Sequence, residues 1–313
     1  MWTSRVPRPR LARLVAGLAA VFLAAACSSS TASSSDTPAT SQDNALGTIE
    51  PGVLTVAIQP YAPYTDKQGD GMSGLDADIV NAIAARLKLQ VKVEVTDFAG
   101  MLAGVQSQRY DMTVGGIAWT AEREKSGLFT DPPYYSPPAM AVGSGKTYQT
   151  VNDLKGLELG TVEGYVWVKS IQEVPDAKLH AYPDGNGVLD DLGAARIDVG
   201  FLDPLIILAA QKARPELKIA TQYLTPPTDD EVKAHPAYDY FRPYMTAFYL
   251  PKQATALEKA FSEEIGKMYA SGEMTTLVQK YGADPNQFLK PAPTMAKTRQ
   301  GVDRPAEWAP PSI

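Results

Sequence analysis

The stretch "YMTAFYL" at residues 244–250 decides the expected fold, because this β-like run comes late in the chain, after two series of alternating segments. Short β-rich runs alternate with helical patterns in both series, and this alternation is typical of α/β units. Two series followed by a late return indicate a chain that runs from one lobe to a second lobe and back. The predicted fold class is therefore α/β with two lobes.

A chain with this path crosses twice between its lobes. The candidate crossings are two extended stretches marked by proline, "SPPAMAV" at 136–142 and "RPYMTAF" at 242–248. Two crossings side by side form a hinge, and a cleft between hinged lobes is a natural site for a small molecule. The sequence therefore predicts a two-strand hinge and a ligand cleft between the lobes.

Hydrophobic periodicity predicts the individual elements. Residues 75–87 carry Ile79, Ile83 and Leu87 at a spacing of four, which indicates a helix with one apolar face. The remaining expected strands lie at 53–58, 91–95, 111–116, 157–162, 178–182 and 197–202. The remaining expected helices lie near 98–108, 164–173 and 187–195, from Pro204 onward, at 253–271 and at 274–281.

The composition excludes several classes of function. The formal net charge is −6 and no basic block lies outside the N-terminus, which argues against nucleic acid as a partner. The two histidines, His180 and His235, lie far apart and the single cysteine is Cys27, so a Cys/His metal site or nucleophile pair cannot be built. No cofactor is expected either, because "GSGKT" at 143–147 lacks the first glycine of a phosphate-binding loop.

The N-terminus has the features of a targeting segment. Several arginines precede an apolar run of 13 residues at 14–26. That run is shorter than the ~20 residues of a membrane-spanning helix. It ends in small residues directly before Cys27, and a serine-rich stretch follows. This pattern resembles a bacterial lipoprotein signal, in which the cysteine is lipidated and becomes the new N-terminus; the alternative is an ordinary secretory signal.

These features predict a division of the chain into five parts. The predicted C-terminal part is an irregular tail that contains five prolines and has Trp308 as its candidate for packing. The parts are a signal peptide (1–26), a lipidated serine-rich tether (27–50), a discontinuous lobe 1 (51–138 and 247–290), lobe 2 (139–246) and the tail (291–313).

The stretch "GGIAWTAERE" at 115–124 contains the first candidate site residue. Arg123 follows a predicted strand-to-helix turn, and on its own it has two interpretations, a solvated helix charge or a ligand contact. Thr120 is a candidate helix N-cap, since Glu122 and Glu124 suit a first turn. The Thr120 hydroxyl is equally compatible with ligand binding.

The order of motifs along the chain resembles the family 3 bacterial extracellular solute-binding proteins, the receptors of polar amino-acid ABC importers. The matching pieces include "YAPY", "GMSGLDADIVNAIAARL", "RYDMTVGG", "TAERE", "FTDPPYY", "DLKGLELGTVEG" and "ARIDVGFLD". Each motif is weak alone, but together they extend from about 51 to 288 in the family's order. The resemblance implies a type II periplasmic-binding-protein fold.

The resemblance also implies roles for particular residues. Arg123 matches the arginine that clamps the ligand's α-carboxylate, and a guanidinium suits this role because its fork makes two parallel bonds. Asp203 matches the acid that holds the α-ammonium, although Asp203 before Pro204 is also a good helix cap. The predicted ligand-binding set is Arg123, Asp203, Thr120, Ala118, Gly116, Tyr61, Phe98, Tyr165 and Trp119. Tyr61 and Phe98 have the alternative of being core aromatics, and Trp119 that of a packing residue.

Departures from the family pattern bear on specificity. Ala118 stands where many members carry a hydroxyl residue, Tyr165 stands where small hydroxyl residues are frequent, and Ile58 stands at a position that is acidic in some receptors for basic amino acids. The pocket is therefore expected to be apolar. A neutral apolar or aromatic amino acid, or a related amine, fits it better than lysine or arginine.

The resemblance implies a monomeric, extracytoplasmic receptor that has no catalytic residues and is anchored to the outer face of the cell membrane through Cys27. Its expected partners are a small-molecule ligand and the permease and ATPase subunits of an ABC importer. One alternative is a cyclohexadienyl or arogenate dehydratase on the same fold, with Glu163 or Glu173 as general acid. Another is a ligand-sensing domain that signals to a partner protein.

Overall fold

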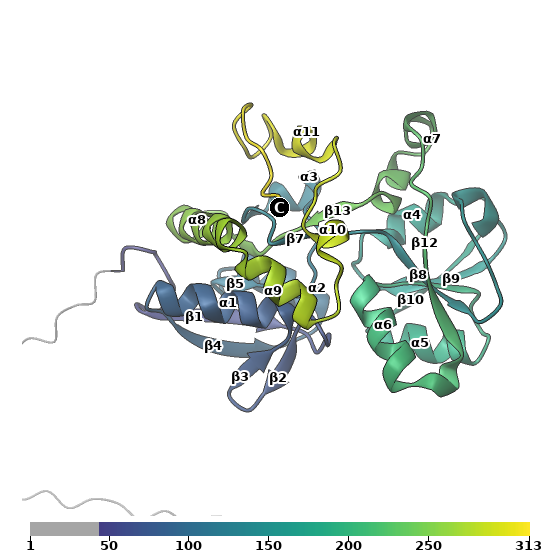
Figure 1. Ribbon diagram of the computed structural model, residues 1–313, viewed down its shortest axis with the longest axis horizontal. Helices are drawn as coiled ribbons and strands as arrows, with labels where there is room; N and C mark the ends of the chain where they lie inside the picture. The colour runs from purple at the N-terminus through teal and green to yellow at the C-terminus, as the bar shows by residue number, and fades with distance from the viewer. Residues whose placement is uncertain (1–43) are drawn as a thin grey trace, which may run out of the picture. The chain divides into compact units, whose positions relative to one another are not determined.

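The computed structural model describes residues 44–313. The predicted signal peptide, the predicted lipidation site Cys27 and most of the predicted tether lie outside the described residues. The described residues contain two separate five-stranded sheets joined by a two-stranded ribbon (Figure 1). Of the helices in this part of the chain, none combines the length and apolar character needed to cross a bilayer.

Lobe 1 is built on a mixed sheet with the strand order β4-β1-β5-β14-β6. Its strands are β1 (Val53–Ile58), β4 (Gln90–Val95), β5 (Met112–Thr113), β6 (Gly127–Phe129) and β14 (Tyr249–Pro251), and a hairpin of β2 (Asp66–Gln68) and β3 (Gly71–Ser73) lies beside them. β1 pairs in parallel with β4 and β5, while β14 is antiparallel to both of its neighbours. The late strand therefore completes the first sheet, as the predicted return of the chain requires.

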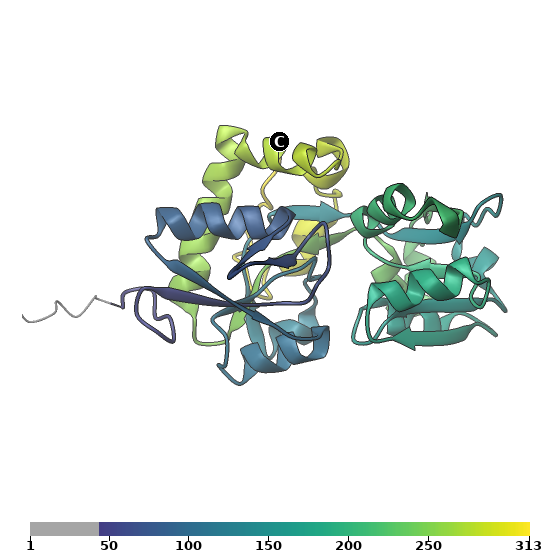
Figure 2. The same cartoon turned by 90° about the horizontal axis from the view of Figure 1, so that it is seen from below.

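The helices of lobe 1 come from both ends of the chain. They are α1 (Leu75–Arg86), α2 (Phe98–Gln106), α3 (Ala121–Glu124), α8 (Thr255–Ser271), α9 (Glu273–Lys280) and α10 (Pro285–Phe288). The predicted apolar face of α1 is correct, because Ile79 and Ile83 are completely buried. The helices α8 and α9 pack against α1, so the yellow-green C-terminal part lies beside the blue N-terminal part (Figure 2). Lobe 1 is therefore built from two stretches of the chain that are separated by lobe 2.

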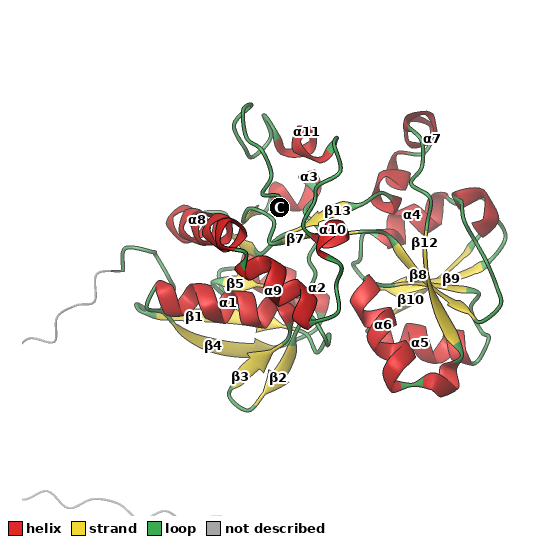
Figure 3. Cartoon of the chain, viewed as in Figure 1, coloured by secondary structure: helices red, strands yellow, loops and turns green. Residues whose placement is uncertain are grey.

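Lobe 2 is built on a second mixed sheet with the order β10-β9-β11-β8-β12. Its strands are β8 (Ala139–Gly143), β9 (Glu158–Val162), β10 (Lys178–Tyr182), β11 (Val199–Phe201) and β12 (Ile219–Tyr223). Its helices are α4 (Trp167–Glu173), α5 (Gly185–Gly193), α6 (Pro204–Ala213) and α7 (Asp229–Ala234), with 3-10 turns η1 (Val151–Leu154), η2 (Pro215–Leu217) and η3 (Pro236–Phe241). Figure 3 shows these helices on either side of the strands of lobe 2. The predicted α/β alternation is confirmed in both lobes.

The ribbon between the sheets consists of β7 (Tyr134–Ser136) and β13 (Tyr244–Thr246), which pair antiparallel. The predicted crossing at 136–142 lies too far along the chain. The hinge strand is β7 at 134–136, and residues 139–143 already form a strand of lobe 2. Residues 139–142 are completely buried, so this apolar run fills a sheet and does not serve as a connection. The predicted run at 244–250 is two strands, one in the hinge and one in lobe 1.

The predicted tether is too long at its C-terminal end. Thr48 is 3% exposed, and the Ile49 backbone N–H donates to Asp111 Oδ1 at 2.7 Å. The second oxygen of Asp111 accepts from the Thr55 N–H on β1. Residues 48–50 are therefore docked on lobe 1, because the Asp111 carboxylate, directly before the central strand β5, binds the Ile49 backbone.

The C-terminal tail also differs from the expectation of an irregular segment. It contains α11 (Met295–Arg299), and the Arg299 side chain is completely buried. Trp308 packs as predicted, and its ring N–H donates to Asp131 Oδ1 at 3.1 Å. The prolines shape this segment, but buried arginine contacts attach it to lobe 1.

Candidate ligand-binding site

A small pocket lies where the two lobes and the hinge meet. Lobe 1 contributes residues from α2, from the turn after β5 and from α3, while lobe 2 contributes residues that follow β9 and β11. The pocket is lined by Phe98, Gly116, Ala118, Arg123, Tyr165, Val166, Trp167, Asp203 and Tyr244. The structure therefore brings six of the nine predicted ligand residues to one pocket.

Thr120 holds the backbone of Arg123. Its hydroxyl oxygen accepts a hydrogen bond from the Arg123 N–H at 3.1 Å, and it stands at the N-cap of α3. Thr120 is not among the residues that line the pocket. The capping interpretation of Thr120 is therefore confirmed, and its contribution to the site is to start the helical turn that presents Arg123.

The guanidinium of Arg123 is oriented by two backbone carbonyls. Its Nη1 donates to the Ala118 carbonyl at 2.8 Å, and its Nη2 donates to the Gly164 carbonyl of lobe 2 at 3.0 Å. The group also lies over the Phe98 ring, 5.2 Å from its centroid. Because a guanidinium has five N–H donors, three remain for an anion in the pocket.

The charge of this guanidinium is retained at neutral pH. Burial lowers the pKa of Arg123 to about 10, and neighbouring tyrosines oppose this shift only in part. A cation in a largely apolar pocket needs a counter-charge to offset its lost hydration. The pocket end at Arg123 is therefore suited to a carboxylate.

Asp203 provides the opposite charge from lobe 2. Its side chain is 3% exposed, its Oδ2 accepts from the Tyr61 hydroxyl at 2.7 Å, and its Oδ1 accepts from the Tyr244 hydroxyl. Burial raises the pKa of Asp203 to about 6, and the bonds from Tyr244 and Tyr61 oppose this rise. Oδ1 also accepts from the Ser136 hydroxyl at 3.5 Å, whereas Oδ2 keeps a further lone pair. The group can therefore accept hydrogen bonds from an ammonium without releasing its tyrosines.

The side chain of Asp203 does not cap α6. Asp203 stands at the N-cap position of this helix, followed by Pro204, but its side chain makes no capping hydrogen bond. Both oxygens are turned to the hydroxyls of tyrosines in lobe 1 and the hinge. The capping alternative is wrong for this side chain, because its two oxygens accept from Tyr61 and Tyr244 instead of from the helix end.

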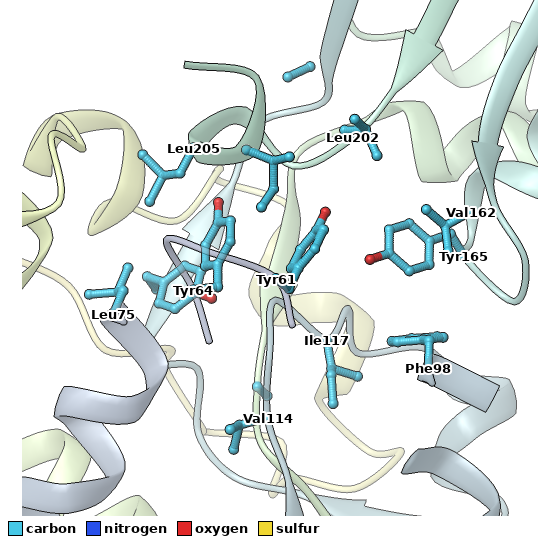
Figure 4. Packing of buried hydrophobic residues seen from close by; sticks show 14 of the residues in the cluster. Tyr61, Tyr64, Leu75, Phe98, Val114, Ile117, Val162, Tyr165, Leu202 and Leu205 are labelled. Atoms are coloured by element: carbon cyan, nitrogen blue, oxygen red, sulfur yellow. The ribbon is translucent and has the colours of Figure 1, made fainter. Parts of the chain in front are cut away.

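Aromatic rings form much of the pocket wall (Figure 4). Phe98 and Tyr165 approach from opposite lobes, with ring centroids 4.9 Å apart and planes inclined by 67°. The Tyr165 hydroxyl accepts from Gln59 Nε2 at 2.9 Å, which adds a third hydrogen bond between the lobes. Tyr61 does not line the pocket; it stands behind Asp203 and meets Tyr165 edge-on. Phe98 and Tyr165 therefore pack on each other in the pocket wall, while Tyr61, predicted to face Phe98 across the ligand, instead orients the acid.

Gly116 is required for close approach to the acid. Its φ is +69°, and a Cβ at this position would lie 3.2 Å from Asp203 Oδ2. The backbone N–H groups of Gly115 and Gly116 donate to the buried carboxylate Asp76 at 2.8 and 2.9 Å. Asp76 therefore fixes the backbone of this turn, and the absence of a side chain at Gly116 leaves room for Asp203.

Trp119 is not a pocket residue, contrary to its place in the predicted ligand set. Ala118 forms an isolated bridge with Thr246 of the hinge and faces the pocket. Successive side chains of an extended segment point to opposite sides. Trp119 therefore points away from the pocket, toward the C-terminal tail, where Arg299 lies 5.6 Å from its ring centroid.

Three pocket residues were missing from the predicted ligand set: Val166, Trp167 and Tyr244. Trp167 begins α4 and is 1% exposed, with its ring N–H donating to the Tyr240 carbonyl at 3.1 Å. Tyr244 lies in the hinge strand and reaches Asp203. Tyr244 could have been predicted, because it lies in the predicted crossing at 242–248 and a hinge strand borders the cleft between the lobes.

The acids considered for a dehydratase lie elsewhere. Glu163 is exposed, and Glu173 Oε2 accepts from the Ala237 N–H at 3.1 Å. Neither is among the pocket residues, and Asp203 is the one carboxylate that lines the pocket in the described part of the chain. Residues 44–313 also contain no group of three or more His, Cys, Asp or Glu side chains placed to hold a metal ion.

Comparison with known proteins places this geometry in a family. A family model described as bacterial extracellular solute-binding proteins, family 3, matches residues 54–284. The arginine-binding protein 1 of an ABC transporter of Escherichia coli K12 is 30% identical over 155 residues, which are 49% of this chain and 63% of that protein. A probable histidine-binding protein of Campylobacter jejuni is 26% identical over 230 residues, or 73% of this chain and 84% of that protein.

Solved structures show the same fold. The amino acid ABC transporter substrate-binding protein AbpA from Streptococcus pneumoniae, bound to L-arginine, superposes with a TM-score of 0.64 at 24% identity. The match covers 74% of this chain and 94% of that one. With the family model matching most of the chain, this protein belongs to the bacterial extracellular solute-binding proteins, family 3, and has the two-lobed fold of type II periplasmic binding proteins.

Proposed function

We propose that this protein is the receptor of an ABC importer and captures an amino acid or a related zwitterionic amine in the pocket between its lobes. One observation carries the proposal: Arg123 of lobe 1 and Asp203 of lobe 2 line the same pocket. A zwitterion needs one cation and one anion at a fixed separation, and this pocket supplies both. The relatives named above are themselves binding proteins for amino acids.

In the proposed complex, Arg123 binds the ligand's carboxylate through a bidentate pair of charge-assisted hydrogen bonds. Asp203 accepts from the ligand's ammonium, while Tyr61 and Tyr244 keep its two oxygens in place. Because the two charges belong to different lobes, only the closed arrangement engages both ends of the ligand. Binding is therefore coupled to closure through this difference in contacts.

The lining of the pocket favours a neutral ligand side chain. Beyond the two charged groups, the walls are aromatic or apolar, and they include Phe98, Tyr165, Val166 and Trp167. A lysine or arginine ligand would bring a second cation, and the described lining residues offer no second carboxylate for it. The free-energy cost of burying an unpaired cation in such a pocket is far larger than the free energy gained by apolar packing. We therefore propose an apolar or aromatic amino acid as the ligand.

Calorimetric titration with a panel of amino acids tests this function. The protein is first unfolded and refolded to release any ligand that copurifies. We expect leucine or phenylalanine to bind more tightly than lysine or arginine, and Arg123→Ala to abolish binding. The matched control is Arg109→Ala, which removes an exposed arginine of the same lobe outside the pocket. Tightest binding of arginine refutes the specificity, and unchanged binding by Arg123→Ala refutes the site.

Membrane attachment is a separate part of the proposal. We infer from the sequence that Cys27 carries a lipid and anchors a monomeric receptor to the outer face of the membrane, with a serine-rich segment as spacer. Labelling with an alkyne-bearing palmitate in a bacterial host is expected to mark the wild-type protein and not Cys27→Ala. Labelling of both proteins, or of neither, contradicts lipidation at this cysteine. Light scattering of the released protein reports its oligomeric state.

No catalytic role is proposed for the pocket. A dehydratase needs a general acid above the leaving group of its substrate. The two glutamates considered for that role lie outside the pocket, and Asp203 is already engaged by two tyrosine hydroxyls.

A further inference from the structure

The C-terminal segment (residues 291–313) lies beyond the residues that match the family, which end at 284. It packs on the rear of the turn that carries Arg123 and on the hinge strands. We propose that Arg299 in this segment is a positioning residue for the ligand-binding arginine: it supports Trp119, and Trp119 holds the neighbours that orient Arg123. This inference rests on the proposed function of Arg123.

Arg299 is held rigidly in the interior of the protein. Its side chain is 0% exposed, and Nη1 and Nη2 donate to the carbonyls of Thr130 and Phe129 at 2.8 and 3.1 Å. Its Nε donates to both carboxylate oxygens of Asp303, at 3.0 and 3.1 Å. These partners pair the buried charge and fix the plane of the guanidinium relative to β6.

This fixed guanidinium makes cation–π contacts with two indole rings. Its central carbon is 5.6 Å from the Trp119 ring centroid and 5.3 Å from that of Trp308. Trp308 is anchored in turn by the bond of its ring N–H to Asp131. Cation–π contacts of this kind are stronger when the groups are removed from water. Trp119 is therefore supported on its outward face by a group that cannot move independently.

Trp119 stands between the two residues that hold Arg123. The Ala118 carbonyl on one side accepts from the Arg123 guanidinium, and the Thr120 hydroxyl on the other accepts from the Arg123 N–H. The backbone N–H of Trp119 donates to the Met245 carbonyl of the hinge at 2.9 Å. A displaced indole would therefore shift the backbone of both neighbours, and Arg123 with them.

The same segment also contacts the hinge directly. The Tyr135 hydroxyl of β7 donates to the Pro311 carbonyl at 2.5 Å. Met295 of α11 packs against Tyr135 and Met245, one from each hinge strand. The C-terminal segment thus contacts both the turn that presents Arg123 and the strands about which the lobes move.

A purely structural role for Arg299 predicts a different result from a positioning role, and Arg304 provides the matched control. Arg304 belongs to the same segment and is also mostly buried, with bonds to Asp131, Glu258 and the Phe129 carbonyl at 2.9, 2.7 and 2.8 Å. Arg304 contacts Trp308 but has no cation–π contact with Trp119. Loss of either arginine destabilises the segment, but only loss of Arg299 removes the support of Trp119.

The first measurement needs no ligand. Hydrogen exchange is recorded on the full ligand-free protein for a peptide that spans 115–124. We expect the Trp119 and Arg123 amides to exchange about tenfold faster in Arg299→Gln than in wild type, while Arg304→Gln leaves them unchanged. Equal exchange in the two variants would show that the arginine supports the fold in general and would overturn the inference.

The second measurement uses L-phenylalanine and L-leucine as probes, at a temperature well below the unfolding midpoint of each variant. We expect Arg299→Gln to weaken binding about tenfold and Arg304→Gln to change it less than about twofold. Arg299→Lys restores part of the loss, because it keeps the cation next to Trp119.

The outcomes separate this inference from the proposed function. If wild type binds neither probe nor any other amino acid, the proposed function fails, while the exchange of the 115–124 peptide still decides whether Arg299 supports the turn. If Arg299→Gln does not fold, Trp308→Ala removes the second indole in contact with Arg299 without unpairing a buried charge. That variant is expected to shift exchange and affinity in the same direction, and no shift in either overturns the inference.

Discussion

Replacing Arg123 by lysine tests whether the guanidinium fork, and not only a positive charge, holds the ligand. Lysine keeps the charge but has a single ammonium, so it cannot bond the Ala118 and Gly164 carbonyls and also meet a carboxylate in bidentate fashion. The lost interaction is one charge-assisted hydrogen bond, which contributes about 1.5–3 kcal/mol. The expected dissociation constant is therefore about 10- to 150-fold larger.

Titration calorimetry against L-phenylalanine and L-leucine measures this change, with Arg109→Lys as the matched control outside the pocket. The decarboxylated analogue phenethylamine provides a second control, because it retains the ammonium that Asp203 accepts and lacks the group that Arg123 binds. We expect the lysine variant to lose affinity for the amino acid and to bind the amine as wild type does. A variant that binds the amino acid within about twofold of wild type would refute the assignment of the carboxylate to Arg123.

Four further outcomes are expected. Ligand affinity is constant at neutral pH and falls by up to about tenfold per pH unit as the pH drops below about 6. The reason is that burial raises the pKa of Asp203 to about 6, so that below this pH a proton competes with the ligand's ammonium for the carboxylate. Calorimetry from pH 5 to 8 checks this, and a flat profile contradicts it. Without ligand, the raised pKa means that the folded state retains a proton that the unfolded chain releases, so the free energy of unfolding falls as the pH rises from about 4 to about 6. Asp203→Asn lacks this loss and should be more stable than wild type at pH 7.5, by up to about 3 kcal/mol, but not at pH 4, in thermal unfolding; a less stable variant at pH 7.5 would show that the carboxylate stabilises the fold. Gly116→Ala weakens ligand binding about tenfold, because its Cβ would crowd Asp203 Oδ2 at 3.2 Å, whereas Gly145→Ala imposes a similar positive φ in open space and leaves affinity unchanged; equal affinities for the two variants argue against the crowding. Incubation with prephenate or arogenate yields no aromatic product, and turnover at enzymatic rates would replace the receptor function by a dehydratase.

The interlobe contacts explain why both charged groups are held ready for a ligand. Arg123 reaches the Gly164 carbonyl, Gln59 reaches the Tyr165 hydroxyl and the Tyr61 hydroxyl reaches Asp203, so three side chains of lobe 1 bond lobe 2. These bonds orient the guanidinium and the carboxylate, so that both groups are placed for the ligand. Preorganised groups lose less freedom on binding, which leaves more of the interaction free energy for affinity.

Local pattern was sufficient for most of the secondary structure and for the backbone of the site. The spacing of Ile79 and Ile83 placed α1, and Thr120 before two glutamates marked the start of α3, because helix periodicity and capping depend on residues within one or two turns. Boundaries were less certain where burial decided them. The sequence at 139–143 is compatible with a connection or with a strand. Only its pairing with β11 on one side and β12 on the other shows that it is a strand.

Alone, the amino-acid sequence determined the order of α/β units, the late return of the chain and, through its motifs, the arginine and the aspartate of the pocket. Only the tertiary structure decided which neighbours face that pocket: Ala118 points in, Trp119 points out, and Trp167 and Tyr244 join from elements distant in the chain. The same holds for Arg299, which lies in the tail that was predicted to be irregular and is completely buried. The physical reason is that periodicity and capping are set by neighbours along the chain, whereas the direction and burial of a side chain depend on groups that folding brings together from far apart.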